Sequence, residues 1–250
     1  MTYSILAKDP ETGAIGIAVA SRFFACGALV PHIGRAAAVA TQAFVNPIWG
    51  TEGLRRLQAG EAGADVLADF TRRDAGQAQR QAHMMDAAGN SVVFTGADCV
   101  DWAGHISGAG FSVAGNMLTG PEVVAQTART WQERTDLPFA ERLLSSMQAG
   151  EDAGGDKRGR QAAALRIHCG QDYPWLDLRV DDHADPLAEM RRLLAVAKER
   201  YLFVAEIMPT AECFSGAPDR RDIDLKILNA EAKRRAEGRE TASLATQSKG

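Results

Sequence analysis

The sequence predicts an α+β fold in which two antiparallel sheets pack face to face and helices cover their outer faces. Two observations support this prediction. Apolar segments typical of strands occur in neighbouring pairs joined by short turns, which is the pattern of antiparallel hairpins. These strand pairs alternate with pairs of helical segments, whereas a doubly wound parallel sheet would alternate single strands with single helices. The predicted order is therefore strands, helix pair, strands, helix pair, strands and helix.

The first hairpin joins predicted strands at residues 3–8 and 14–20 through a turn that contains Pro10 and Gly13. If this turn is tight, Thr2 lies opposite Ser21 and Ser4 lies opposite Val19. Side chains two residues apart point to the same face of a strand, so Thr2 and Ser4 share a face. The register therefore predicts a polar group at the open end of the hairpin.

The other predicted strands share short apolar runs bounded by turn residues. They lie at residues 27–31, 36–43, 81–86, 91–95, 102–107, 111–114, 162–168 and 176–180. Apolar residues at helical spacing predict helices at residues 47–60, 62–72, 120–135, 139–148, 186–206 and 222–235. We expect Asn46 to cap the first of these helices, Gly150 to end the fourth, and Asp185 to cap the fifth.

Composition indicates a globular protein without unusual partners. The chain has 250 residues, a formal net charge of −4 and a pI near 5.8, which favours neither nucleic acid nor an anionic membrane as a partner. The four cysteines are scattered and form no C-x-x-C pair, so neither a metal site nor a disulfide framework is predicted. Without a signal peptide or a membrane span in the sequence, we expect a cytoplasmic protein that uses no cofactor.

Thr2 follows the initiating methionine directly, and small second residues such as threonine permit removal of that methionine. A threonine hydroxyl needs a base at hydrogen-bonding distance before it can act as a nucleophile. A free α-amino group titrates near ~7.7–8.0 and can accept a proton near neutral pH. A mature chain that begins at Thr2 would therefore carry nucleophile and base on one residue, although most chains that begin Met-Thr have no such activity.

Several blocks, in order along the chain, resemble the DUF1028 family, which is assigned to the Ntn-hydrolase-like superfamily. The resemblance runs from about residue 2 to about residue 205 and rests on MTYSILAKDPETGAIGIAVASRF, VATQAFVNPIWGTEGLRRLQAG, GNML and AGGDKRGRQAAAL. It implies a four-layer αββα sandwich over residues 1–210, with residues 211–250 as an extension that is helical at first and disordered from about residue 232. It also implies a hydrolase that cleaves a linear amide or carbamoyl bond of a small molecule, with Thr2 as the nucleophile.

The sequence departs from the pattern of proteasome-type members of that superfamily. The second strand ends in Ser21-Arg22 instead of an acidic residue, and no lysine occurs between Lys8 and Lys157. The charge that a lysine supplies in those enzymes would have to come from Arg22 or Arg158. This departure motivates a second hypothesis, a small-molecule-binding protein without catalysis on the same fold, and a third, an enzyme whose nucleophile is Ser4 or Ser21.

Other candidate site residues lie where strands end or loops are rich in glycine. Thr41 and Gln42 end an apolar strand, where a hydroxyl and an amide could line the pocket. Asn116 follows Gly115 and is a candidate oxyanion donor. Asp156 and Arg158 lie in a polar loop, where we expect Arg158 to bind a carboxylate of the substrate and Asp156 to orient it.

Three further expectations complete this picture. Cys26 lies in an apolar stretch, which should raise the pKa of its thiol and keep it inert. The histidines are expected to be structural because none has a metal-ligand partner at helical spacing. Two-sheet sandwiches of this kind often associate through their outer helices, so a homodimer is also expected.

Overall fold

The computed structural model of the chain describes residues 2–245 and contains two antiparallel sheets. The six-stranded sheet has the order β10-β9-β2-β1-β8-β7, and the four-stranded sheet has the order β3-β4-β5-β6. The strands are β1 (Thr2–Lys8), β2 (Ile15–Ser21), β3 (Pro31–Ile33), β4 (Ala38–Ala43), β5 (Arg80–Met85), β6 (Ser91–Thr95), β7 (Gly104–Gly108), β8 (Phe111–Asn116), β9 (Ala162–His168) and β10 (Leu176–Val180).

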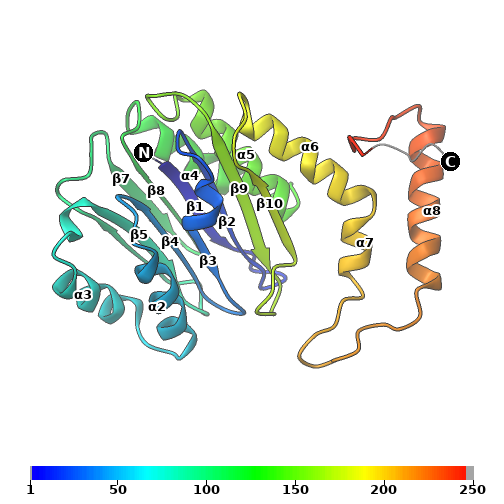
Figure 1. Ribbon diagram of the computed structural model, residues 1–250, viewed down its shortest axis with the longest axis horizontal. Helices are drawn as coiled ribbons and strands as arrows, with labels where there is room; N and C mark the ends of the chain where they lie inside the picture. The colour runs from blue at the N-terminus through cyan, green and yellow to red at the C-terminus, as the bar shows by residue number, and fades with distance from the viewer. Residues whose placement is uncertain (1, 246–250) are drawn as a thin grey trace. The chain divides into compact units, whose positions relative to one another are not determined.

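Helices cover the outer faces of both sheets, so the predicted four-layer αββα sandwich is confirmed (Figure 1). Helices α4 (Glu122–Glu133) and α5 (Phe139–Asp152) pack on the six-stranded sheet. Helices α2 (Pro47–Gln58) and α3 (Gly63–Arg73) pack on the four-stranded sheet. Asn46 caps α2 as expected, because its side chain accepts a hydrogen bond from the backbone nitrogen of Ile48.

The register of the first hairpin is also confirmed. Ser4 pairs with Val19 and Leu6 pairs with Ile17, and this register continues to place Thr2 opposite Ser21. On its other side β1 pairs with β8, so that Thr2 lies opposite Asn116. Because β1 and β2 are buried along almost their whole length, a register shift of one residue would move every side chain of the shifted strand to the opposite face of the sheet, and buried polar groups would lose their partners.

Apolar side chains between the two sheets form the central core. This cluster includes Leu6, Ile17 and Val19 from the six-stranded sheet and Ala40 and Met85 from the four-stranded sheet. A second cluster lies between the four-stranded sheet and its helices, and Trp49 and Phe70 pack against each other there with ring centroids 5.4 Å apart.

Residues 27–31 do not form the strand that the sequence predicts. They divide between a single helical turn, α1 (Cys26–Leu29), and the start of β3. A Cβ atom on Gly27 would lie 2.5 Å from the Cβ of Ala164, so this turn packs directly against β9. The small and apolar residues that suggested a strand instead allow a helical turn to pack closely on the sheet.

Two predicted helix ends are wrong. Gly150 lies inside α5, which continues to Asp152. A Cβ atom at this position would lie 2.3 Å from Thr127 Oγ1 and 2.9 Å from the Tyr3 ring, so no larger residue fits here. The glycine therefore permits close packing of α5 on α4 and β1 instead of ending the helix. The long predicted helix at residues 186–206 is broken at Arg200 into α6 (Pro186–Glu199) and α7 (Tyr201–Ala205).

The chain forms two compact units, Met1–Met190 and Arg191–Gly250. In the second unit, α8 (Arg221–Ala236) confirms the predicted helix at 222–235, and Glu206 pairs with Lys226 at 2.6 Å. Residues 232–236, expected to be disordered, belong to α8, whereas 246–250 lie outside the described residues. The domain boundary expected near residue 210 stays a prediction.

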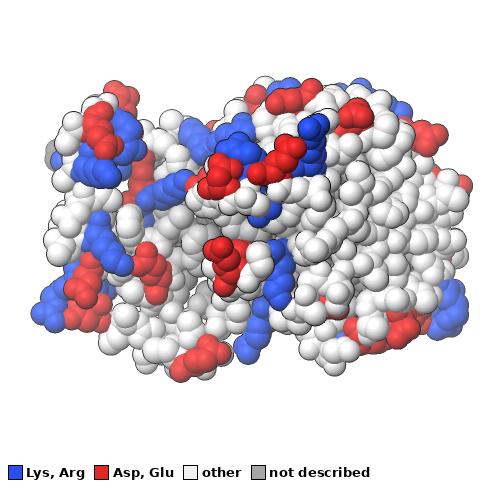
Figure 2. Space-filling model, turned by 180° about the vertical axis from the view of Figure 1, so that it is seen from behind, with Lys and Arg blue, Asp and Glu red and all other residues white. Residues whose placement is uncertain are grey.

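Charges of both signs are mixed on the surface. On the face that Figure 2 shows, Lys and Arg side chains lie beside Asp and Glu side chains, and neither sign forms a continuous field. Every helix within residues 2–245 is too short or too polar to cross a lipid bilayer.

The inter-sheet core can be tested by Leu6→Ala. Leu6 is fully buried, so the substitution should leave a cavity and lower the free energy of unfolding by about 2–5 kcal/mol. Ile48→Ala is the matched control, because Ile48 is 63% exposed and its truncation should change stability by less than about 0.5 kcal/mol. Urea denaturation measures both variants, and equal effects would contradict the assigned core.

Candidate functional site

Thr2 is the first residue of β1 and lies between the last residues of β2 and β8. Its hydroxyl Oγ1 is 3.1 Å from Ser21 Oγ, and Asn116 Nδ2 donates a hydrogen bond of 3.4 Å to its carbonyl oxygen. Thr2 is only 6% exposed. Three predicted site residues, Thr2, Ser21 and Asn116, are thus brought together by strand pairing alone.

A chain of buried polar side chains extends from this point between the two sheets. Asn116 Nδ2 and Gln42 Nε2 both donate to Gln81 Oε1, at 3.0 and 2.8 Å. Gln42 Oε1 accepts a hydrogen bond from Ser4 Oγ at 2.7 Å. We call Ser4, Gln42, Gln81, His83, Ser112 and Asn116 the inter-sheet network. Because every buried side-chain nitrogen and oxygen of the described residues has a partner, this network holds the sheets in one relative position.

His83 occupies the centre of the inter-sheet network. Its Nε2 is 2.9 Å from Ser4 Oγ and its Nδ1 is 2.6 Å from Ser112 Oγ. Burial, followed by the charge of His105, lowers the pKa of His83 to about 3. The imidazole is therefore neutral at physiological pH and links two strands, in agreement with the structural role expected for it.

Two cavities meet at the end of β4, where Ala43 lines both of them. The Thr2 cavity, of about 60 Å³, is lined by Thr2, Gln42 and the apolar side chains of Phe23, Leu29, Val30 and Val45. The Asn116 cavity, of about 240 Å³, is lined by Asn116 and by Gln79, Asp98 and Val100 among others. The sequence did not single out these walls, because isolated apolar residues in loops carry no local signal.

Cys26 also lines the Thr2 cavity. Burial, followed by the charge of Asp181, raises the pKa of its thiol to about 12. The thiol therefore stays protonated and acts as part of the apolar wall, as the sequence predicts.

Strained backbone conformations occur beside the same two cavities. Within residues 2–245, positive φ angles at non-glycine positions occur at Ala25 (53°), Ala43 (67°) and Met117 (55°). Ala43 and Met117 line cavities, and Ala25 directly precedes Cys26. Residues with side chains adopt this conformation at a cost of about 1–3 kcal/mol each, and such positions cluster at functional sites.

Asp156 connects the polar loop to the end of β2. Its carboxylate accepts hydrogen bonds from the backbone nitrogens of Arg22, at 2.8 Å, and Arg158, at 2.7 Å. The Arg158 guanidinium lies 3.4 Å from the same carboxylate and is 42% exposed. The Arg22 side chain donates to Gln161 at 3.0 Å. Asp156 thus holds the backbone of the loop against the end of β2, and the guanidinium groups of Arg22 and Arg158 both reach solvent.

Thr41 and Ser4 lie away from the cavities. Thr41 points to the opposite face of β4 from Gln42, under α2, and its hydroxyl donates to the carbonyl of Asn46 at 3.3 Å. Ser4 is fully buried within the inter-sheet network. Of the hydroxyls considered as nucleophiles, Thr2 is the one that lines a cavity.

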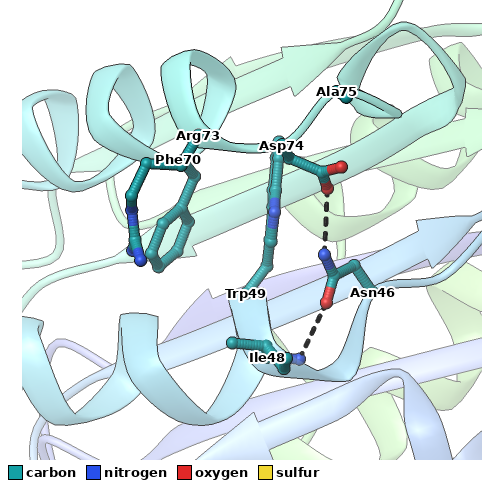
Figure 3. A pocket seen from close by; sticks show the side chains of 7 residues that line it. All are labelled: Asn46, Ile48, Trp49, Phe70, Arg73, Asp74 and Ala75. Atoms are coloured by element: carbon teal, nitrogen blue, oxygen red, sulfur yellow. Dashed lines mark hydrogen bonds between the residues drawn. The ribbon is translucent and has the colours of Figure 1, made fainter.

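A third cavity, of about 250 Å³, lies between α2 and α3 on the outer side of the four-stranded sheet (Figure 3). Trp49 and Phe70 form its apolar part, and Arg73 lies over the Phe70 ring at 5.5 Å. Asp74 accepts a hydrogen bond from Asn46, whose own oxygen caps α2 (Figure 3). Residues 2–245 contain no group of three or more His, Cys, Asp and Glu side chains that could hold a metal ion.

The fold and the site thus define an α+β two-sheet sandwich with a hydroxyl at the start of its first strand, beside two cavities. The model of a family of unknown function, DUF1028, matches residues 2–190, and the chain belongs to this family. Protein SPO2555 from Silicibacter pomeroyi, whose crystal structure is assigned to the DUF1028 family model, is 34% identical to it. The alignment covers 87% of this chain and 99% of that one, with a TM-score of 0.80. No curated protein matches the chain.

The buried neutral state of His83 predicts a pH dependence of stability. An unfolded chain takes up this proton near pH 6.5, whereas the folded protein resists protonation down to about pH 3. The free energy of unfolding should therefore be insensitive to this group above pH 6.5. It should fall as the pH drops toward 3, by up to about 1.4 kcal/mol per pH unit.

His83→Gln tests this prediction, because glutamine retains hydrogen-bonding groups but cannot take up the proton. Urea midpoints measured from pH 7 to pH 4 should decline less steeply in the variant than in the unchanged protein. The comparison uses the slope, so an overall loss of stability in the variant does not disturb it. Identical slopes would show that His83 is not the buried neutral group described above.

Proposed function

We propose that this protein is an N-terminal-nucleophile amidohydrolase that cleaves a linear amide or carbamoyl bond of a small molecule. One observation carries the proposal. Thr2 begins the first strand of a two-sheet sandwich, and its side chain lines a cavity beside a second hydroxyl, that of Ser21, at 3.1 Å. The proposal requires a mature chain that begins at Thr2, and Met1 lies outside the described residues.

The reaction divides into two steps. Thr2 Oγ1 attacks the amide carbon while its proton passes to the free α-amine, and the amine then protonates the leaving nitrogen. An acyl ester on Thr2 and a free amine result. Water then attacks the ester with the same α-amine as base, which releases the acid and restores the hydroxyl. Ser21 Oγ, within hydrogen-bonding distance of Thr2 Oγ1, orients the nucleophile during both steps.

Asn116 supports this chemistry as a positioning residue. Its amide nitrogen already donates to the Thr2 carbonyl and to Gln81. Both hydrogens of the amide are therefore engaged, which argues against the oxyanion role expected from the sequence and favours a role in fixing the Thr2 backbone. Arg158 lines neither the Thr2 cavity nor the Asn116 cavity, so its expected contact with an anionic end of the substrate stays a prediction.

A second candidate function is binding of a small molecule without turnover. Among the described residues, the side chain that hydrogen-bonds to Thr2 Oγ1 is a serine, not the lysine or carboxylate of proteasome-type enzymes. A serine activates a neighbouring hydroxyl less than a lysine or a carboxylate does, so this observation favours a Thr2 that is a weaker nucleophile than in those enzymes. Under this alternative the cavities would bind ligand, and Thr2 would be one wall of the binding site.

Substitution of Thr2 separates the two functions. We expect Thr2→Ser to keep activity and Thr2→Ala to lose it entirely, because only the former retains a hydroxyl on the first residue. Ser21→Ala should lower kcat about 10- to 100-fold, because the nucleophile loses its orienting partner. Hydrolysis of a panel of N-acyl p-nitroanilides and ureido acids measures all three variants. Full activity of Thr2→Ala would contradict the proposal, and binding without turnover in the unchanged protein would favour the second function.

A further inference from the structure

The two cavities beside Thr2 differ in size and chemistry, and this difference bears on the substrate. We infer that the Thr2 cavity receives the acyl part of the substrate and that this part is an uncharged, linear aliphatic chain of about three to four carbons, the carbonyl carbon included. The inference rests on the proposed function, because it assigns the acyl group that Thr2 would carry. The amine part of the substrate then lies in the Asn116 cavity.

The walls of the Thr2 cavity are apolar. Phe23, Leu29, Val30 and Val45 contribute hydrocarbon, and Cys26 contributes a protonated thiol. The polar Gln42 is already engaged, because its oxygen accepts from Ser4 and its nitrogen donates to Gln81 and to the Ala114 carbonyl. No charged side chain of the described residues lines this cavity. A carboxylate placed here would lose its hydration without gaining a partner, so acyl groups such as succinyl are disfavoured.

The size of the cavity sets the chain length. It measures about 60 Å³. An apolar cavity of about 150 Å³ accommodates benzene, roughly 25 Å³ per carbon, so this cavity holds about two to three carbons beyond the carbonyl carbon at Thr2. An acetyl group would leave it partly empty, and an octanoyl chain would exceed it. Phe23, at the rim, is 54% exposed and marks the end that is open to solvent.

The Asn116 cavity suits the other half of the substrate. It measures about 240 Å³ and presents the polar side chains of Gln79, Asp98 and Asn116 beside Val100 and Phe44. Because Ala43 lines both cavities, a substrate whose reacting carbon lies at Thr2 can extend into both at once. The carboxylate of Asp98 favours an amine part that carries hydrogen-bond donors.

The test uses p-nitrophenyl esters of acetic, butyric, hexanoic, octanoic and succinic acids. Thr2 Oγ1 attacks the ester carbon, p-nitrophenolate leaves, the hydroxyl proton passes to the α-amine, and intact mass reports the acyl group retained on the chain. The rate measured with Thr2→Ala is subtracted from the rate of the unchanged protein, because this subtraction removes the contribution of other nucleophiles. We expect kcat/KM to rise about fourfold per methylene up to butyryl, then to fall.

Variants of the cavity wall shift this optimum. Val45 lies in a partly exposed loop, so Val45→Phe should fill the cavity and move the optimum toward acetyl, whereas Val45→Ala should move it toward octanoyl. Ile48→Ala is the matched control, because Ile48 lines the separate cavity between α2 and α3, and its chain-length profile should not change.

The outcomes separate the inference from the function on which it rests. Acylation of Thr2 with a flat profile, a preference for succinyl, or a profile that Val45 variants do not move would overturn the assignment of the cavity and leave the nucleophile in place. If no ester acylates a chain whose first residue is Thr2, the amidohydrolase proposal itself fails. A butyryl optimum that moves with Val45 supports both.

Discussion

The pairing of β1 with β2 on one side and with β8 on the other determines where Thr2, Ser21 and Asn116 lie. This pairing sets Thr2 opposite Asn116 and within hydrogen-bonding distance of Ser21. Because strand side chains alternate between faces, the same register directs Ser4 into the inter-sheet layer and Tyr3 toward α5, where its hydroxyl donates to the Met147 carbonyl. No loop is needed to bring Thr2, Ser21 and Asn116 together, because they lie where three paired strands meet at one edge of the sheet.

The inter-sheet network is the second constraint, because it gives the sandwich a polar centre as well as an apolar one. Gln81 links Gln42 and Asn116, which come from different sheets, and its own nitrogen donates to the Gly115 carbonyl at 2.8 Å. Any slide of one sheet over the other would leave buried amides without partners, at a cost of about 1–3 kcal/mol for each. This rigidity extends to Thr2 through Asn116, and a preorganised nucleophile needs such support.

The sequence predicts those features that depend on neighbouring residues. The turn with Pro10 and Gly13 was enough to fix the register that sets Thr2 opposite Ser21, and Asn46 was correctly identified as a helix cap. Features that depend on distant residues were missed. Gly150 looks like a helix end until Thr127 and Tyr3 pack against it. The alternation of Gln81 and His83 in an otherwise apolar strand was the available signal for the inter-sheet network. The role of residues such as Val45 in lining the Thr2 cavity could be recognised only from the folded structure.

The central claim is that Thr2 is the functional first residue of the mature chain, and the intact mass of protein expressed without an added N-terminal tag tests it most directly. The account predicts a mass lower by one methionine residue and an N-terminal sequence that begins Thr-Tyr-Ser-Ile. Such a chain has a free α-amine on the residue whose hydroxyl contacts Ser21. A chain that retains Met1 in full would have no such amine on Thr2, and this result would contradict the account and favour binding without catalysis.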